Sequence, residues 1–143
     1  MLKTKLLKSY SETLMFEYKL SVRGYELDSY GHVNNAVYLN YFEQARWEIF
    51  RQLDLINYFM NNQLLLVVTE MQVRYSREAR LFEELVIRTK MEKEAPYLVF
   101  SQKMFLEGTR VKVCSATVKT LLTDKKKLTL DIPEDFLSKL KLR

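Results

Sequence analysis

The sequence is poor in the residues that build metal centres and nucleotide-binding loops. With one Cys and one His, a single chain cannot form a Cys/His cage of the structural zinc type. The three glycines, Gly24, Gly31 and Gly108, rule out the P-loop, the GxGxxG fingerprint and the GxSxG motif. These counts do not exclude a carboxylate site for Mg²⁺ or Ca²⁺, but no EF-hand loop is present. We expect no metal and no bound cofactor.

Long apolar runs are missing too. The longest covers residues 64–68, whereas a membrane span needs about 20 apolar residues. Residues 1–15 mix lysines with scattered leucines and lack the apolar core and cleavage site of a secretory signal. Cys114 sits in an apolar stretch, which is typical of a small buried side chain in a reducing compartment. We therefore expect a cytoplasmic protein without a membrane span.

What is present describes one ordinary globular domain. The 143 residues are 48% hydrophobic and 29% charged, and we divide them into an extension at 1–15 and a domain at 16–143. The net charge of +5 is moderate and suits a small anionic ligand as well as it suits a nucleic acid. Because the aromatic residues are not interleaved with a basic stripe, we expect no nucleic-acid partner.

The hydrophobic pattern predicts one long helix and five strands. Helical spacing covers residues 35–53, about 28 Å at 1.5 Å per residue, with Asn34 or Asn35 as the N-cap. On this helix Trp47 lies about 180° from Tyr38, which suggests a helix covered on more than one side. Alternation predicts strands over 16–22, 65–75, 85–92, 98–106 and 114–122, with hairpin turns at 95–96 and 107–108, and Pro133 opens a short last helix.

This order predicts an α+β fold with a largely antiparallel sheet around the long helix. In the strand over 65–75, the odd-numbered residues are expected to share one face. A sheet of this kind leaves an edge strand free, and proteins often protect such an edge by pairing it with a second copy. We therefore expect a homodimer or a homotetramer.

The segment from Val22 to Tyr38 holds the residues best suited to chemistry. A carboxylate (Asp28), the only imidazole (His32) and the start of the long helix fall within eight residues. Amides at a helix start can stabilise the negative charge that develops on a carbonyl oxygen during acyl transfer. Asp28 could reach the other side of such a carbonyl as nucleophile or as base for water. On spacing alone, turn and capping roles are the better explanation of the same residues.

Specific motifs within this segment and beyond it resemble a known family. The stretch Arg23–Asp28, the run His32-Val33-Asn34-Asn35-Ala36 and the motif Glu43–Trp47 look like the hotdog-fold thioesterases of the 4-hydroxybenzoyl-CoA thioesterase type. The likeness is strongest to their bacterial long-chain acyl-CoA thioesterase branch. It continues more weakly through Val73–Ala79 and covers about residues 16–140.

The resemblance implies a hotdog fold and hydrolysis of an acyl-CoA, with coenzyme A as part of the substrate. Asp28 matches the catalytic carboxylate of the family, and Asn35 matches the helix-start amide that polarises the thioester carbonyl. His32 matches a histidine of the related plant acyl-carrier-protein thioesterases, but Tyr30 replaces the Asn of their Asp-x-Asn-x-His pattern. We expect these three residues to be catalytic, and we expect substrate contacts from Val33, Asn34, Tyr38 and Arg74.

Three other functions are compatible with this pattern. A hotdog dehydratase would hold its histidine and its acid on different elements, whereas Asp28 and His32 share one turn. A non-catalytic acyl-CoA or lipid-binding protein could use the same fold. The carrier could also be an acyl-carrier protein instead of coenzyme A. The sequence favours the acyl-CoA hydrolase, of which medium- to long-chain fatty acyl groups are the expected substrates.

Overall fold

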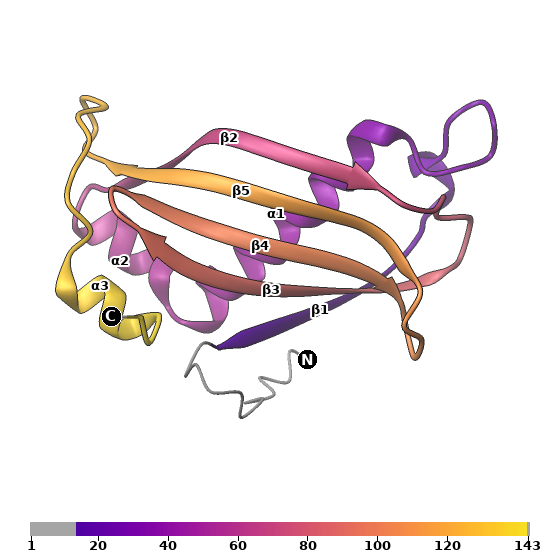
Figure 1. Cartoon of the computed structure of the whole chain (residues 1–143). Coiled ribbons are helices and arrows are strands. Elements are labelled where there is room, and N and C mark those ends of the chain that lie inside the picture. Colours follow the sequence, from indigo (N-terminus) through magenta and orange to yellow (C-terminus); the bar gives the residue numbers. More distant parts are fainter. Residues whose placement is uncertain (1–13, 143) are drawn as a thin grey trace.

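The computed structural model describes residues 14–142, so residues 1–13 of the predicted extension lie outside the described part. The elements follow the predicted order with additions (Figure 1). They are β1 (Met15–Ser21), the 3₁₀ turn η1 (Gly24–Glu26), α1 (Asn35–Gln52), α2 (Leu55–Asn61), β2 (Leu65–Tyr75), β3 (Glu84–Glu94), β4 (Tyr97–Leu106), β5 (Lys112–Thr123) and α3 (Glu134–Lys139).

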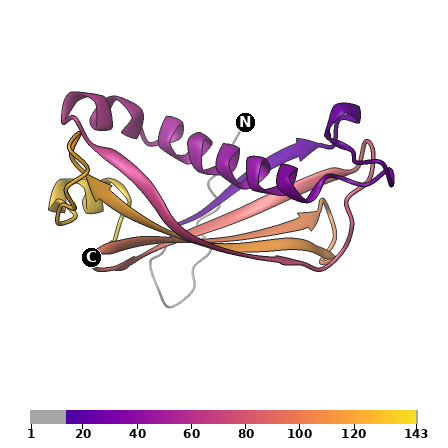
Figure 2. The ribbon, with the colours of Figure 1, turned by 90° about the horizontal axis from the view of Figure 1, so that it is seen from above.

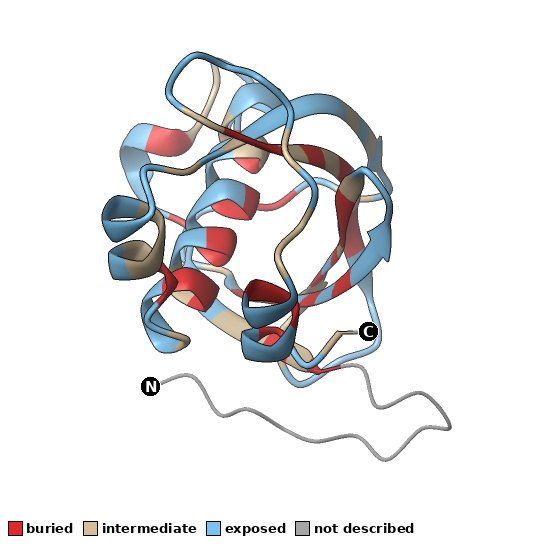
Figure 3. Ribbon diagram, turned by 90° about the vertical axis from the view of Figure 1, so that its left-hand side faces the viewer, coloured by how far each residue is buried: buried red, intermediate tan, exposed pale blue. Residues whose placement is uncertain are grey.

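The five strands form one antiparallel sheet in the order β1-β3-β4-β5-β2, which confirms the predicted sheet. Helix α1 runs along one face of this sheet, and Figure 2 shows it lying over the strands in a separate layer. The sheet curves toward the helix, and the buried residues face each other across the space between them (Figure 3). Among the described residues, no helix has the length and apolarity needed to cross a bilayer.

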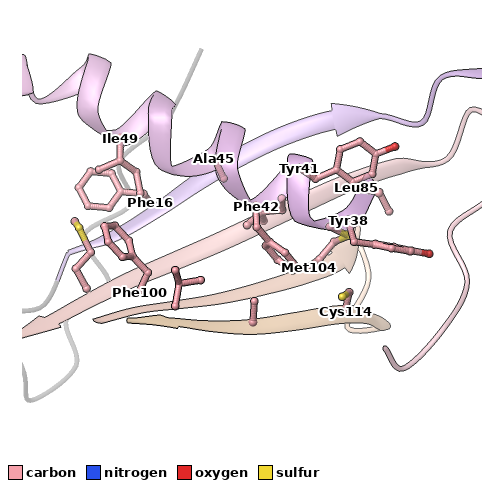
Figure 4. Close-up of a cluster of buried hydrophobic side chains, with 14 of the residues drawn as sticks. Phe16, Tyr38, Tyr41, Phe42, Ala45, Ile49, Leu85, Phe100, Met104 and Cys114 are labelled. Carbon is pink, nitrogen blue, oxygen red and sulfur yellow. The ribbon is translucent and has the colours of Figure 1, made fainter. Parts of the chain in front are cut away.

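The core fills the space between α1 and the sheet. Its helical side consists of residues at helical spacing, among them Phe42, Ala45 and Ile49, all at most 2% exposed (Figure 4). Complete burial of an aromatic side chain such as that of Phe42 contributes about 1.5–3 kcal/mol. Cys114 packs in this core from β5, and burial raises the pKa of its thiol to about 11. The prediction of a buried cysteine is therefore confirmed.

Strand β2 differs from the prediction because it contains a bulge. Its pairing with β5 shifts register between Val68 and Glu70, and one extra residue on a strand exchanges its two faces. Before the bulge Leu66 packs against the core, whereas Val67 is 39% exposed. After the bulge the odd-numbered Val73 packs inward as predicted. The predicted face is therefore wrong for the first half of the strand.

Helix α2 was not predicted. Asp54, in the left-handed conformation with a φ of 56°, ends the path of α1 and lets a second short helix begin. In α2 Leu55 is fully buried, and the ring of Phe59 packs edge-on against Phe50 of α1 at 5.5 Å. Trp47 also differs from the expectation: it is 50% exposed, so the described part of the chain does not cover the back of α1 at this residue.

Candidate active site

A tight turn fixes Asp28 just before the long helix. Its amide donates to the carbonyl of His32 at 2.7 Å, and the chain reverses through Gly31, whose φ of 77° favours glycine. The Oδ1 atom of Asp28 accepts from the amides of Tyr30 at 2.9 Å and His32 at 3.2 Å. Within the described residues, the other carboxylate oxygen, Oδ2, has no hydrogen-bond partner. One oxygen therefore holds the turn while the second remains available for chemistry.

The start of α1 offers a free amide beside this turn. Asn34 is the N-cap, since its side-chain oxygen accepts from the amide of Ala36 at 2.9 Å and its carbonyl accepts from Val37 at 2.8 Å. The amide of Asn35 has no partner among residues 14–142, and it lies at the positive end of the helix dipole. This N–H can donate to an anionic or polarised oxygen.

Two tyrosines form the apolar wall next to the helix start. Tyr38 is 3% exposed, and its ring packs edge-on against Tyr75 of β2 at a centroid distance of 5.4 Å. The hydroxyl of Tyr38 accepts from the amide of Ala79 at 2.9 Å, and that of Tyr75 donates to the carbonyl of Asn35 at 2.9 Å. Burial raises the pKa of Tyr38, so its hydroxyl stays protonated. These bonds fasten the loop after β2 to α1.

That loop brings a second acid to the site. Nε2 of His32 lies 3.2 Å from Oε2 of Glu78, and the main chain of His32 pairs with that of Arg80. Arg77 also reaches the site, but its guanidinium already binds the carboxylate of Glu83, with the NH2–Oε2 pair at 3.0 Å. Glu78 was not among the residues expected at the site. Only pairing between distant segments brings it to His32, and no local spacing in the sequence signals that pairing.

These residues surround one open hollow of ≈ 580 Å³, the active-site hollow. Five of the residues expected at the site line it. Four of them lie just before α1 or at its start, namely Asp28, His32, Val33 and Asn35. The fifth, Tyr38, lies in the first turn of α1. The lining residues are Asp28, Tyr30, His32, Val33, Asn35, Tyr38, Tyr75, Ser76, Arg77 and Glu78.

Two expected substrate contacts lie elsewhere. Asn34 caps the helix at the edge of the hollow without being part of its lining. Arg74 follows Val73, which points to the core, so its side chain lies on the opposite face of the sheet and lines a different hollow. A single chain therefore does not bring Arg74 to Asp28, and its contact with substrate stays a prediction.

Glu26 supports the helix start from the 3₁₀ turn. Its carbonyl accepts from the amide of Asn34 at 2.9 Å, and its carboxylate accepts from the amide of Arg23 at 2.8 Å and from the Arg23 guanidinium. Burial by itself would raise the pKa of Glu26, but the hydrogen bonds from Arg23 outweigh burial and lower it below 4.5. This carboxylate therefore stabilises the fold in its ionised form.

We expect Glu26→Gln to make the free energy of unfolding less dependent on pH in the acid range. Because the pKa of Glu26 is lower in the folded than in the unfolded chain, its contribution is complete above the unfolded value of 4.5 and is lost as the pH falls through the folded value. At neutral pH the substitution should lower the free energy of unfolding by about 1.5–3 kcal/mol. Urea unfolding at several pH values between neutrality and strong acid measures both effects.

The exposed Glu94 at the end of β3 provides a matched control for this measurement. Glu94→Gln removes the same charge and should leave the acid limb of the stability curve as in the unaltered protein. If Glu26→Gln also left that limb unchanged, the Arg23–Glu26 pair would not stabilise the folded state.

The arrangement combines what thioester cleavage requires. Asp28, whose Oδ2 has no partner within residues 14–142, and Asn35, whose amide begins the helix, line the same hollow. A carbonyl placed between them could be attacked on one side and polarised on the other. Among the described residues, no group of three or more His, Cys, Asp or Glu side chains could hold a metal ion. The expectation of no metal and no cofactor stays a prediction.

Comparison with known proteins agrees with this chemistry. The model of the thioesterase-like superfamily matches residues 22–140, which is most of the chain. The chain belongs to the thioesterase-like superfamily. Within this superfamily it is 32% identical over 109 residues to the long-chain acyl-CoA thioesterase FadM of Escherichia coli, covering 76% of this chain and 83% of FadM.

Other similar proteins bear on the fold and on the acyl carrier. The chain is 26% identical over 125 residues to a chloroplastic acyl-acyl carrier protein thioesterase of Arabidopsis thaliana, covering 86% of this chain and 66% of that relative. The crystal structure of the Escherichia coli protein YbaW superposes with a TM-score of 0.80 at 30% identity, over 87% of this chain and 96% of that one. A 1,4-dihydroxy-2-naphthoyl-CoA thioesterase from Synechocystis also gives 0.80 at 11% identity, over 89% and 96%, and shares the fold alone. The predicted hotdog fold is confirmed.

Proposed function

We propose that this hotdog thioesterase hydrolyses medium- to long-chain fatty acyl-CoA thioesters to the free acid and coenzyme A. The observation that carries the proposal is that Asp28 and Asn35 line one hollow, while among the described residues neither Oδ2 of Asp28 nor the amide of Asn35 has a hydrogen-bond partner. The relationship to FadM, a long-chain acyl-CoA thioesterase, supports the choice of substrate. No cofactor is required, because coenzyme A enters as part of the substrate.

The chemistry starts with the thioester carbonyl oxygen accepting a hydrogen bond from the amide of Asn35. In one route, Asp28 attacks the carbonyl carbon, the thiolate leaves, and water hydrolyses the resulting mixed anhydride. In the other route, Asp28 takes a proton from a water molecule that attacks directly, and returns this proton to the departing thiolate. Both routes consume one water and release one carboxylic acid and one thiol. Both place the developing negative charge next to the helix start.

We assign the His32–Glu78 pair to the leaving-group side of the reaction. The imidazole lies at the opening of the hollow, with its side chain 34% exposed and its Nε2 held by Glu78. In the first route, where Asp28 takes up no proton before the carbon–sulfur bond breaks, His32 in this position can donate a proton to the coenzyme A thiolate. Hydrolysis of the mixed anhydride then releases the proton that returns to His32. Val33 and Tyr38 supply the apolar lining next to the reacting carbonyl.

We also propose that the enzyme works in the cytoplasm as a homodimer or homotetramer. Strand β2 is an edge of the sheet, and its backbone groups are free to pair with another strand. Exposed apolar side chains gather along this edge and on the uncovered back of α1, where burial against a second copy would be favourable. These residues are Trp47, Leu65, Val67 and Val68.

The proposal is tested by thiol release from a panel of substrates. The panel contains short-, medium- and long-chain acyl-CoAs, one aromatic acyl-CoA, and a long-chain acyl group on acyl-carrier protein. We expect the highest kcat/KM, about 10⁴ M⁻¹ s⁻¹ or more, for the longer acyl-CoAs. A preference for the carrier protein would favour the activity named for the Arabidopsis relative. Tight binding of acyl-CoA without turnover would overturn hydrolysis and leave a binding protein.

A further inference from the structure

The outer face of the sheet is turned away from α1 and toward the viewer in Figure 1. This face carries a second hollow. It measures ≈ 460 Å³ and lies over the middle of β2, β4 and β5. Three of the residues that line it, Val73, Gln102 and Ala116, contribute only their backbone, because their side chains point to the core on the opposite face. The side chains that face outward are Gln72, Arg74, Ser101, Lys103, Ser115 and Thr117.

Strand register arranges these side chains in two rows across the sheet. In the first row Arg74 on β2 lies opposite Ser115 on β5, which in turn lies opposite Lys103 on β4. Ser115 is thus a short side chain between two long cationic ones. Arg74 and Lys103 are two strand spacings apart, or about 10 Å between their backbones. Their side chains can converge on a group that rests above the serine.

The second row adds neutral hydrogen-bonding groups. Gln72 on β2 lies opposite Thr117 on β5, which lies opposite Ser101 on β4. Ser101 and Ser115 are partly buried, whereas Gln72, Arg74 and Lys103 are exposed. The hollow therefore has a floor of hydroxyl groups and a rim of long polar side chains. None of its lining residues is acidic.

The two cations at the rim are uncompensated. Within the described part of the chain, neither Arg74 nor Lys103 has a carboxylate within ion-pair distance. Other cations of the same face do: Arg88 binds Glu17 at 3.1 Å, and Lys119 lies 4.0 Å from Glu70. Two like charges that converge without a counter-ion oppose each other, and an anion between them removes that cost.

We propose that this outer hollow binds the phosphate or pyrophosphate group of a nucleotide. A phosphate accepts several hydrogen bonds, which guanidinium, ammonium and hydroxyl donors can supply together. The volume is within the range of small-ligand sites. The outer hollow is distinct from the active-site hollow, because Arg74 and Tyr75 point to opposite faces of β2. The nucleotide is either the one within coenzyme A or a free nucleotide that acts as a separate ligand.

Isothermal titration with ADP and with adenosine 3′,5′-bisphosphate tests binding directly. The unaltered protein should bind with an affinity that falls as salt is added, and Arg74→Gln or Lys103→Gln should each weaken it about tenfold or more. Lys125→Gln removes the same charge from a distant exposed turn and should change the affinity less than twofold. Because both cations are on the surface, the thermal midpoints of the variants should match that of the unaltered protein. No saturable binding, or equal binding by Lys103→Gln, would overturn the proposal.

Steady-state hydrolysis distinguishes the two sources of the nucleotide. If the outer hollow takes the nucleotide of coenzyme A, Lys103→Gln raises KM for acyl-CoA at unchanged kcat and leaves KM for acyl-pantetheine unaltered. If it takes a free nucleotide, KM for acyl-CoA is the same in both proteins, and ADP does not compete with the substrate. The titrations do not depend on turnover. Nucleotide binding in a protein that fails to hydrolyse every thioester would overturn the proposed function alone.

Discussion

Asp28→Asn should lower kcat for acyl-CoA hydrolysis about 10²–10⁴-fold, the loss expected when a positioned acid–base group is removed. The asparagine retains an oxygen where Oδ1 of Asp28 accepts from the amides of Tyr30 and His32, so the turn should persist. The amide nitrogen that replaces Oδ2 can neither attack a carbonyl nor accept a proton from water. Thiol release at saturating substrate measures kcat, and KM should change little because the apolar lining of the hollow is intact.

Asp54→Asn is the matched control for this experiment. Asp54 is exposed whereas Asp28 is half-buried. The carboxylate of Asp54 also accepts a hydrogen bond, from the side chain of Asn57 at 2.9 Å, but it lies at the junction of α1 and α2. The control should retain the activity of the unaltered enzyme. An Asp28→Asn enzyme with near-normal kcat would exclude Asp28 from both routes, as nucleophile and as base.

Gln102→Leu should lower the free energy of unfolding by about 2–4 kcal/mol. Arg46 is 9% exposed, and its NH1 donates to the side-chain oxygen of Gln102 at 2.9 Å. The amide of Gln102 in turn donates to the carbonyl of Phe42 and to the hydroxyl of Thr89. Burial lowers the pKa of Arg46, which shows that the guanidinium is poorly solvated where it lies. Without Gln102 this charge has lost its hydrogen-bonding partner in the core.

A double-mutant cycle separates this cause from a simple loss of packing. Arg46→Met replaces the cation with an apolar side chain, and the double variant Arg46→Met with Gln102→Leu should be more stable than Gln102→Leu alone. Denaturation by guanidinium chloride gives the four free energies of unfolding. If Gln102→Leu cost the same in both backgrounds, the two residues would be energetically independent, and the contact would not explain the loss.

Most of the architecture could be predicted from the sequence because it follows from periodicity. The alternation in the last three strands and the helical spacing of 35–53 each correspond to one buried face, and the structure confirms those elements, with the helix ending at Gln52. The features that differ depend on backbone conformation at single residues. Asp54 ends the path of α1 and lets α2 begin, and the bulge near Thr69 exchanges the faces of β2. A prediction that treats each segment as a regular helix or strand cannot anticipate either α2 or the bulge.

In the candidate site, too, only some of the residues could be predicted from the sequence. Asp28, His32 and Asn35 could be predicted together because a short turn keeps residues of one contiguous segment close. Glu78 could not, since it reaches His32 only through pairing of the loop after β2 with the turn before α1. Arg74 was expected to contact the substrate, but the alternation of β2 places it on the face of the sheet opposite the active-site hollow. The first difference depends on how distant segments meet, and the second follows from the alternation within one strand.

The bulge in β2 gives the two halves of this strand outward surfaces of different chemistry. Before it, the outward side chains are apolar, as at Leu65 and Val67, and after it they are polar, as at Gln72 and Arg74. Because of a single additional residue, the same edge strand presents an apolar surface to a neighbouring chain at one end and a cationic surface to a dissolved anion at the other. The two surfaces can then diverge independently in evolution, because a substitution in one half of the strand leaves the outward chemistry of the other half untouched.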